Sequence, residues 1–538
     1  MRNNLLKNTA DKAYLVTIIT MIWNRINNSL EKLLNMKLKI QLLMGSMLLS
    51  LFINIPLYSK VLLNEAEFRD HIYACWLGKN IGGTLGMPFE GKKGLNNISF
   101  YTNLKSGEPA ANDDLDLQIL WLKAMQENSA RVDAYKLGEY WLKYVPVNWN
   151  EYDVCKENMK VGIMPPLSGE YNNQKWKNSN GAWIRSEIWA CLAPGCPLLA
   201  AQMAREDACV DHGTAEGTLA EIFTASIESA AFIESDRDKL INFGLSMIPE
   251  NCRVARAVRT AIAAKRAGKD WQTARAEVIK DTEDMGWFQA PANVAFTIIG
   301  WLYGDGDFGK SICIAINCGD DTDCTGATLG SILGIIGGTK AIPEKWRKPI
   351  GDKIKTVAIS GFQTPENLSV LTNQTLAMAK KVLIMNNSPV TITDRNNYLL
   401  EAKNLLSIDQ NALHSLWDLS PYQIIKNERD LTIIIDYQSD PLIQSNVPRI
   451  IHVVVKNQTL VTKSLELRLL GLPEDWKFTG LPDKAVDLKS YDSKTYTLAF
   501  LAPEIKSYVN TMKLNVTEET SSVSIPLVLL YPMANEKK

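Results

Sequence analysis

The chain of 538 residues is longer than one hydrophobic core usually organises, so two or more domains are expected. Its 46% hydrophobic and 22% charged residues are typical of a globular protein and exclude a disordered chain. A formal net charge of −1 gives no general attraction to nucleic acid, whose binding proteins carry basic faces.

Residues 1–60 carry a pattern typical of export. Two lysines after Met36 precede an apolar run from Ile40 to about Leu57, which is the arrangement found in a signal peptide. A membrane anchor is the alternative, because the run approaches the ~20 apolar residues that span a bilayer. We interpret the segment as an N-terminal extension with a signal peptide, with Met36 as an alternative start, and expect an exported protein, periplasmic or secreted. Its mature chain would start between about residues 57 and 67, and only an uncleaved segment would contact a membrane.

The nine cysteines show no spacing typical of a disulfide framework or of a zinc site. Most of them stand among apolar or small residues, as in YACWLG (73–78) and SICIAINCG (311–319), where buried free thiols are common. We therefore expect free cysteines.

The chain after residue 60 changes its hydrophobic period once. From 64 to 384, apolar residues recur at helical spacing, as in EIFTASIESAAFIES (221–235). From 430 to 538 the period changes to two: apolar and polar residues alternate in SLELRLLG, TYTLAF and MKLNV, which together with LTIIIDY, RIIHVVVKNQ and VSIPLVLLY make about six short strands. Residues 385–429 join the two regions. The predicted fold is therefore multidomain, with an all-α domain followed by a small all-β sandwich.

The first acidic segment, NDDLDLQ, occupies residues 112–118. Asn112 is a favoured helix N-cap and acids suit the first turn, so an ordinary helix start is one interpretation. It does not explain three aspartates within four positions ahead of an apolar face, where Asp113 and Asp116 would share one side of a helix. The segment is therefore a candidate source of ligands.

The second acidic segment carries Asp320, Asp321 and Asp323 and leads into glycines at every fourth position from 326 to 338. It is not an EF-hand, because Ile332 occupies the place of the last glutamate. Clustered carboxylates repel unless a cation or protons neutralise them, and oxygen ligands favour Mg²⁺, Mn²⁺ or Ca²⁺. Small residues at this spacing let a second helix approach closely. We predict that the helix starting with NDDLDLQ packs there and that both segments bind metal, with helix caps on a close-packed core as the alternative.

Two other kinds of site are not expected. The segment GDGDFG (304–309) has the form G-x-G-x-x-G, but it follows a helical pattern and its two aspartates would repel a pyrophosphate, so we interpret the match as chance. The four histidines are spread over the whole chain, which makes a Ser-His-Asp nucleophile set unexpected.

Five segments resemble, in the same order, motifs of the ADP-ribosylglycohydrolase family. They are LGKNIGGTLGMPFEG (77–91), NDDLDLQ (112–118), NGAWIR (180–185), DHGTAEG (211–217) and CGDDTDCTGA (318–327). The resemblance implies an all-α domain with a centre of two Mg²⁺ or Mn²⁺ ions that cleaves the bond at the anomeric carbon of ADP-ribose.

The resemblance also implies roles for individual residues. The implied metal ligands are side-chain oxygens of residues in three segments: Glu90, Asn112, Asp113, Asp114, Asp321 and Asp323. Glu90 and Asp114 would also be catalytic, with Glu90 as an acid or base. The residues it implies for substrate binding are Asn180, Gly181, Arg185 and His212. The plainer alternatives are a loop acid for Glu90, a solvated helix residue for Arg185, and a packing or capping role for His212.

The sequence departs from the family pattern within these motifs. Gly83 stands where the family usually has aspartate, Asn112 where it has a threonine ligand, and Cys324 where it has the final threonine. A thiol is a poor ligand for Mg²⁺. Asp116 and Asp320 are extra acids that could compensate.

These observations predict a metal-dependent hydrolase that removes ADP-ribose or a related α-linked glycosyl group. Its substrate would be a small molecule or a glycosyl group and not a nucleic acid. Two alternatives stay open: an exported glycosidase acting on another sugar, and a pseudo-enzyme that binds the sugar while its sandwich domain docks to carbohydrate or a partner. The four core aspartates favour an enzyme, whereas Gly83 and Cys324 favour the pseudo-enzyme.

Overall fold

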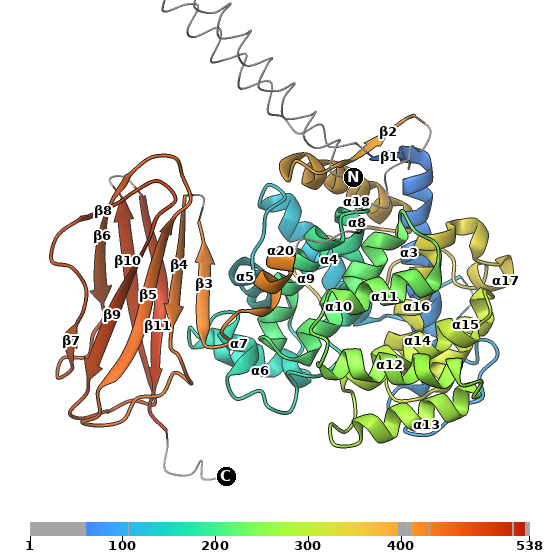
Figure 1. Cartoon of the computed structure of the whole chain (residues 1–538), viewed down its shortest axis with the longest axis horizontal. Coiled ribbons are helices and arrows are strands. Elements are labelled where there is room, and N and C mark those ends of the chain that lie inside the picture. The colour runs from blue at the N-terminus through green and yellow to red at the C-terminus, as the bar shows by residue number, and fades with distance from the viewer. Residues whose placement is uncertain are drawn as a thin grey trace, which may run out of the picture. The chain divides into compact units, whose positions relative to one another are not determined.

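The computed structural model describes residues 61–105, 107–395, 406, 410–428, 430–518 and 521–532 (Figure 1). The apolar run at 40–57, and with it the signal-peptide prediction, lies outside the described residues. Within the described ranges, no helix combines the length and the apolar character needed to cross a membrane.

The first region is helical, as the sequence predicts. Its helices are α3 (Glu65–Gly86), α4 (Asp113–Glu127), α5 (Ala134–Tyr144), α6 (Asn150–Lys160), α7 (Leu167–Glu170), α8 (Glu187–Leu192), α9 (Pro197–His212), α10 (Glu216–Ala231), α11 (Arg237–Ser246), α12 (Arg253–Arg266), α13 (Trp271–Thr282), α14 (Ala290–Tyr303), α15 (Phe308–Asn317), α16 (Thr322–Gly337), α17 (Glu344–Arg347) and α18 (Leu368–Met385). Short 3-10 turns occur at η1 (Met87–Phe89), η2 (Trp183–Arg185) and η3 (Thr339–Ala341). The apolar helix α14 is buried along its whole length, as expected for a central helix.

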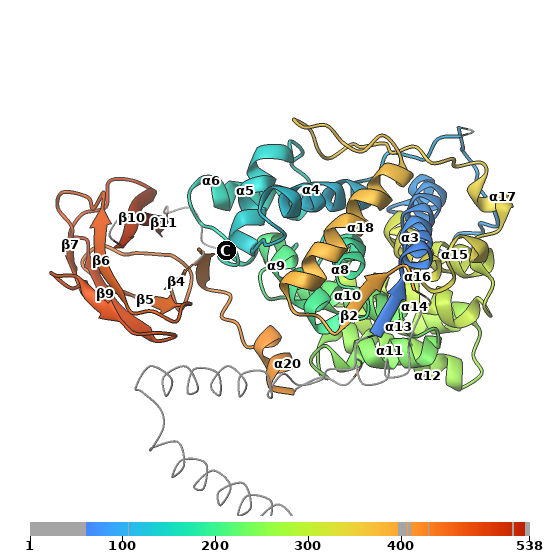
Figure 2. The same cartoon turned by 90° about the horizontal axis from the view of Figure 1, so that it is seen from above.

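Helices α3 and α16 form the closest pair in this region and lie side by side in both views (Figures 1 and 2). A methyl group added at Gly78 would lie 2.1 Å from the carbonyl oxygen of Gly330, and one added at Gly82 would lie 2.0 Å from that of Gly326. The prediction that α4 packs against these glycines is therefore wrong. The partner is α3, because it carries its own glycines at four-residue spacing and so allows backbone-to-backbone contact.

The two ends of the helical region are joined by a small parallel sheet. Strand β1 (Val61–Asn64) directly precedes α3, and strand β2 (Val390–Thr393) follows α18. They pair in parallel with Val61 opposite Val390. The segment predicted as a join therefore begins with a strand that returns to the start of the helical region.

The C-terminal region consists of two antiparallel sheets, with strand orders β3-β4-β5-β9-β7 and β11-β10-β6-β8. The strands are β3 (Gln423–Asn427), β4 (Leu431–Asp436), β5 (Arg449–Asn457), β6 (Lys463–Leu470), β7 (Lys477–Thr479), β8 (Val486–Leu488), β9 (Ser493–Leu501), β10 (Val509–Glu518) and β11 (Ser521–Leu530). The six predicted strands are all present. The prediction did not include β3, which lies in the predicted join, or the three-residue strands β7 and β8.

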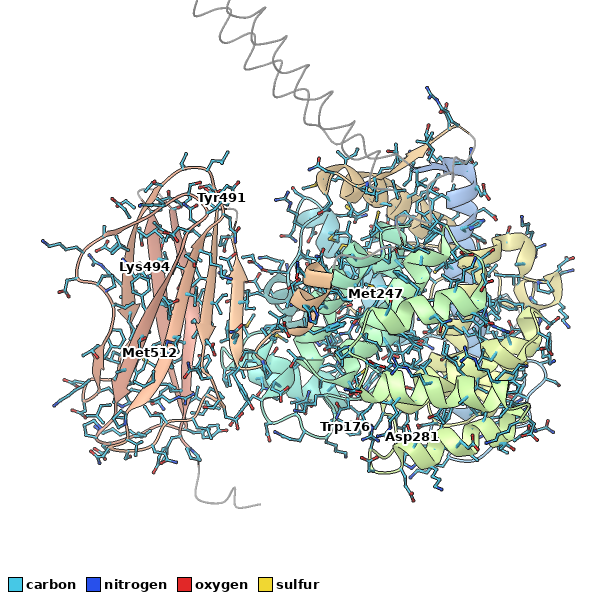
Figure 3. All side chains as sticks on the ribbon, in the orientation of Figure 1. Trp176, Met247, Asp281, Tyr491, Lys494 and Met512 are labelled. Carbon is cyan, nitrogen blue, oxygen red and sulfur yellow. The ribbon has the colours of Figure 1, made fainter. Side chains whose placement is uncertain are left out.

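Alternating burial along the strands explains why this region forms sheets. In β10, Met512, Leu514 and Val516 are buried and the residues between them are less so. Met512, labelled in Figure 3, has no exposed surface. Side chains at every second position of β10 therefore lie on the buried face of its sheet and form part of the hydrophobic core, as period-two patterning requires.

Candidate metal centre

The first acidic segment starts α4. Asn112 is its N-cap: the side-chain oxygen accepts a hydrogen bond from the Asp114 amide at 2.8 Å. The same side chain donates from its nitrogen to Asp323 Oδ2 at 3.2 Å. The capping interpretation is therefore correct, and in addition the amide joins the two acidic segments. In this orientation the oxygen of Asn112 serves the cap, so its predicted role as a metal ligand has no support from its contacts.

The second acidic segment is a tight turn before α16. Gly319 (φ 82°) and Asp320 (φ 66°) both adopt left-handed conformations, in which glycine and aspartate are tolerated best. The turn points Asp320 away from the other acids, since its carboxylate accepts hydrogen bonds from Asn293 Nδ2 at 3.0 Å and from the Phe288 amide at 3.3 Å.

Asp116, the other extra acid, also has a structural role. Its Oδ2 accepts hydrogen bonds from the amides of Val357 and Ala358, each at 2.6 Å. The suggestion that Asp116 and Asp320 compensate for missing ligands finds no support: both oxygens of Asp320 accept hydrogen bonds elsewhere, and Asp116, whose Oδ1 has no hydrogen-bond partner among the described residues, belongs to neither of the acidic groups described next.

Four of the remaining acids, together with Cys324, form two groups that share the Asp323 carboxylate, and Asp113 belongs to neither group. Ligand atoms of Glu90, Asp321 and Asp323 all lie within 4.8 Å of one another, and so do those of Asp114, Asp323 and Cys324. Asp323 Oδ1 and Asp114 Oδ2 are buried and have no hydrogen-bond partner among the described residues. Buried carboxylate oxygens without a hydrogen bond are costly, so this arrangement fits a site completed by cations.

The electrostatics of the cluster support the same conclusion. The charge of Asp323, followed by burial, raises the pKa of Glu90 to about 7. Burial, followed by the charge of Asp323, raises the pKa of Asp113 to about 6 and that of Asp321 well above its ordinary value. Like charges held together in a buried place disfavour ionisation, and a divalent cation would remove that cost.

Glu90 and Asp113 occupy the more accessible side of the cluster. Glu90 follows the 3-10 turn η1 and is exposed. Asp113 is half-buried, and its Oδ2 accepts a hydrogen bond from the Tyr152 hydroxyl at 3.0 Å. Asp114 is 1% exposed and lies deeper. A ligand entering from solvent would therefore meet Glu90 before Asp114.

Lys79 is a site residue that the sequence analysis missed. It is fully buried on α3, with its Nζ 2.7 Å from Glu187 Oε1 and 3.6 Å from Asp114 Oδ2. Burial lowers its pKa, but Glu187 and Asp114 outweigh burial and the net shift is upward, so the side chain is a cation. The signal in the sequence was a single charged residue inside the segment YACWLGKNIGG, which is otherwise uncharged.

Asn180 and Gly181 lie beside Asp321. Asn180 donates from Nδ2 to Asp321 Oδ2 at 2.7 Å, and its Oδ1 accepts a hydrogen bond from Trp183 Nε1 at 2.9 Å. Trp183 thereby fixes the orientation of the amide. A methyl group at Gly181 would lie 2.1 Å from Glu151 Oε1, so glycine is needed for the close approach of Glu151.

Arg185 is not solvated, so the plainer alternative for this residue is wrong. Its side chain is fully buried, where Nε donates to Asp207 Oδ1 at 2.8 Å and Nη2 donates to Asp211 Oδ1 at 2.7 Å. These contacts are those of a buried ion-pair network, and contact of Arg185 with substrate stays a prediction.

His212 has neighbours that the sequence did not predict. Its Nε2 lies 3.1 Å from Ser179 Oγ, and its Nδ1 lies 2.8 Å from Asp211 Oδ1. The three residues resemble a Ser-His-Asp set, but all are buried, and the Ser179 hydroxyl donates to the Trp176 carbonyl at 2.5 Å. A serine committed to that carbonyl is no nucleophile, so the set holds the segment that carries Asn180. The packing alternative for His212 describes these contacts, and a role in substrate binding stays a prediction.

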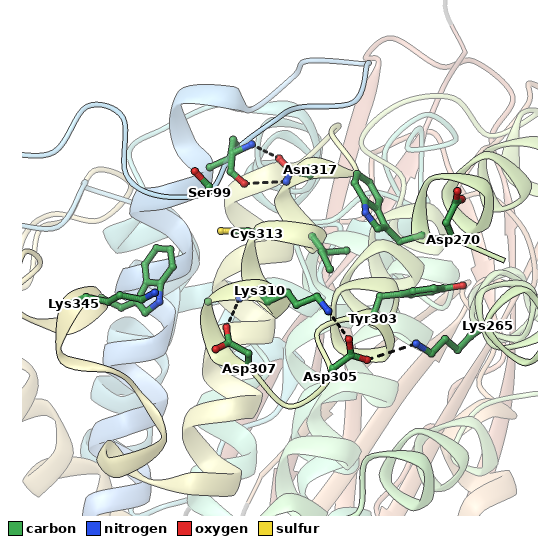
Figure 4. Close-up of a pocket in the computed structure, with 15 residues that line it drawn as sticks. Ser99, Lys265, Asp270, Tyr303, Asp305, Asp307, Lys310, Cys313, Asn317 and Lys345 are labelled. Carbon is green, nitrogen blue, oxygen red and sulfur yellow. Dashed lines mark hydrogen bonds and ion pairs between the residues drawn. The ribbon is translucent and has the colours of Figure 1, made fainter. Parts of the chain in front are cut away.

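A separate cavity of about 500 Å³ lies at α13, α14, α15 and α17 (Figure 4). Its lining includes Trp271, Tyr303 and Lys310 and, among the described residues, none of the predicted site residues. The GDGDFG loop contributes Asp307, which caps α15 by accepting from the Lys310 amide at 2.6 Å. This glycine-rich loop thus serves as a helix start.

The family is decided by a match along the helical region. Residues 64–377, more than half of the chain, match the family model described as ADP-ribosylglycohydrolase. The chain belongs to the ADP-ribosylglycohydrolase family. The match confirms the family that the five motifs predicted. All five motifs lie within the matched residues.

Solved structures similar to this ADP-ribosylglycohydrolase-family chain include one described as an ADP-ribosylglycohydrolase-related protein complex, with 20% identity, a TM-score of 0.41, and coverage of 60% of this chain and 99% of that chain. Another is the FixG-related protein from Vibrio parahaemolyticus, with 14% identity, a TM-score of 0.16, and coverage of 19% and 95%. A third is the GAE domain of GGA2p from Saccharomyces cerevisiae, with 14% identity, a TM-score of 0.16, and coverage of 20% and 97%. No curated protein matches the chain.

Proposed function

We propose that the protein is a metal-dependent hydrolase that cleaves the bond at the anomeric carbon of ADP-ribose or of a related α-linked sugar. The observation that carries the proposal is the sharing of Asp323 between two acidic groups, each with a buried carboxylate oxygen that has no hydrogen-bond partner among the described residues. Membership of a hydrolase family supports the reaction class.

The carboxylates that would hold the cations are those of the two groups, Glu90, Asp114, Asp321 and Asp323, with Asp113 as the further ligand that the family resemblance implies. Mg²⁺ or Mn²⁺ held by Glu90, Asp321 and Asp323 would supply Lewis-acid chemistry, binding a sugar diol and lowering the pKa of bound water.

The protein's own residues have separate tasks in this proposal. Glu90 is exposed, so it can contact substrate and move a proton to or from the reacting oxygen. Asp114 is buried and lies beside Lys79, so we assign it to holding the cluster in place instead of proton transfer. Asn180 orients Asp321.

Turnover assays test this function. ADP-ribosyl-arginine, ADP-ribosyl-serine and a panel of aryl glycosides would be incubated with the protein, with and without Mg²⁺. We expect turnover of at least one substrate that requires metal and is lost in Glu90→Gln. Binding of ADP-ribose without turnover of any substrate would instead support the sugar-binding pseudo-enzyme, which Cys324 in place of an oxygen ligand favours.

A further inference from the structure

We propose that the two acidic groups take different cations: Glu90, Asp321 and Asp323 bind Mg²⁺ or Mn²⁺, whereas Asp114, Asp323 and Cys324 bind a thiophilic cation such as Zn²⁺ or Co²⁺ and reject Mg²⁺. The inference rests on the proposed metal centre. It predicts one Mg²⁺ ion per chain, in contrast to the two that the family resemblance implies.

The difference begins with the ligand atoms. The first group offers carboxylate oxygens only, which suit hard cations. In the second group the Cys324 sulfur lies 3.4 Å from Asp114 Oδ1, with the thiol donating to the carboxylate. Thiolate favours Zn²⁺ and similar cations over Mg²⁺.

The neighbouring oxygens do not replace the sulfur. The oxygen of Asn112 accepts the Asp114 amide. The carboxylates of Asp116 and Asp320 accept hydrogen bonds from other segments. A Mg²⁺ ion near Cys324 would therefore find two carboxylates, one of them shared with the first group.

Charge adds to the discrimination. The Lys79 ammonium lies 3.6 Å from Asp114 Oδ2 and already offsets part of that charge. When a thiophilic cation binds Cys324, the S–H bond breaks, the sulfur–metal bond forms and the proton leaves to solvent. The sulfur then carries a negative charge, which offsets part of the charge of the cation. Mg²⁺ gains little from that exchange, so the lysine disfavours Mg²⁺ more than Zn²⁺.

Cobalt spectroscopy tests the sulfur ligand directly. Titration of the folded full-length protein with Co²⁺ is expected to produce sulfur-to-cobalt charge-transfer absorption in the near ultraviolet. Cys324→Ser and Cys324→Thr should both abolish it. The other eight cysteines are the internal control. All nine are free, and within the described part of the chain Cys324 is the one that belongs to a candidate metal-binding group.

Calorimetric titration with Mg²⁺ gives the second readout. We expect one ion per chain in the parent and two in Cys324→Thr, which restores the family's oxygen ligand. Two Mg²⁺ ions in the parent, or Co²⁺ absorption that survives both substitutions, would overturn the inference. The parent titrations need no variant, so they decide the question even if a substitution impairs folding. Sulfur–cobalt absorption together with no Mg²⁺ binding at all would count against the proposed function and against the first group, but not against the thiophilic site.

Discussion

Gly82 of α3 and Gly326 of α16 meet backbone to backbone, so that a methyl group at Gly82 would lie 2.0 Å from the Gly326 carbonyl oxygen. This contact sets the position of the first turn of α16, which carries Asp323. Stability and metal binding therefore share one structural element, and a substitution there should affect both.

Gly82→Ala is expected to lower the free energy of unfolding by about 3 kcal/mol or more, because the added carbon overlaps a backbone that cannot move aside cheaply. Mg²⁺ affinity should fall in the same variant. Gly94→Ala is the matched control, since a Cβ there meets nothing within 4 Å. Chemical denaturation and calorimetry measure both effects, and equal stability of the two variants would contradict the close contact.

Asp321→Asn is expected to weaken Mg²⁺ binding at least tenfold, about 1.4 kcal/mol, because it removes a charged ligand. The metal-free variant should be as stable as the parent or slightly more so, since one repelling charge is gone. Asp320→Asn is the neighbouring control and should leave Mg²⁺ affinity nearly unchanged, as its carboxylate faces Asn293 and Phe288. Equal Mg²⁺ affinities for the parent and Asp321→Asn would contradict the metal site and leave helix capping as the explanation of the acidic segments.

The metal-free protein should lose stability as the pH rises from about 4 to about 7. The pKa of Glu90 rises in the folded state from 4.5 to about 7, and that of Asp113 from 3.8 to about 6. Over that window the folded state holds more protons than the unfolded state, so each added pH unit favours unfolding. Melting temperatures across this range, measured with and without Mg²⁺, check the prediction.

Mg²⁺ should reverse that loss, because a ligand that binds only the folded state raises its stability. Other buried acids with raised pKa values, such as Glu151 and Asp116, shift stability in the same direction. The part that Mg²⁺ restores therefore isolates the cluster. An increase of metal-free stability between pH 4 and 7, or no effect of Mg²⁺ at pH 8, would contradict the assignment.

Trp183→Phe is expected to weaken Mg²⁺ binding severalfold, because the Asn180 amide loses the hydrogen bond that fixes its orientation toward Asp321, a loss of about 1 kcal/mol. Trp189→Phe is the control. It removes a comparable buried hydrogen bond, from Trp189 Nε1 to Asp207 Oδ2 at 2.9 Å, on the Arg185 network. Both should lower the melting temperature, but only Trp183→Phe should change metal affinity.

The start of the exported protein, predicted from the sequence to lie between about residues 57 and 67, is expected between about 57 and 61 once strand β1 is taken into account. The apolar run ends near Leu57, and cleavage after Val61 would remove residues of β1 that pair with β2. N-terminal sequencing of the protein from the extracellular or periplasmic fraction measures the start. A chain that stays in the cytoplasm with its original methionine would refute the export prediction.

Much of the fold follows from local patterns. Helical spacing predicted the helical region, and alternation or short apolar runs between turn residues predicted six strands; β4 is one of the runs, with five consecutive buried residues. The strands β7 and β8 were missed since three residues are too few to show a period. The partner of α16 was also misjudged: glycine spacing predicts that another helix comes close, but it does not say which one.

The candidate site was predictable where a residue's chemistry showed in its own segment. The aspartates of the two acidic segments stood out for that reason, and the structure places Asp323 in one group with Asp114 and in another with Asp321. Lys79 and the Ser179–His212 contact did not stand out, because their partners are distant in sequence. Asp320 looked like its neighbours in the sequence, and only the left-handed turn at this residue directs it elsewhere.

Asp323 makes the two acidic groups thermodynamically dependent on each other. Since one carboxylate serves both, filling either group changes the affinity of the other by the same factor, whichever cation arrives first. A carboxylate already bound to one dication attracts a second less strongly, so the coupling is expected to be negative. A chain saturated with Mg²⁺ would then need more Zn²⁺ to fill its second group, and the balance of the two cations in its surroundings would govern how much of the protein is fully loaded.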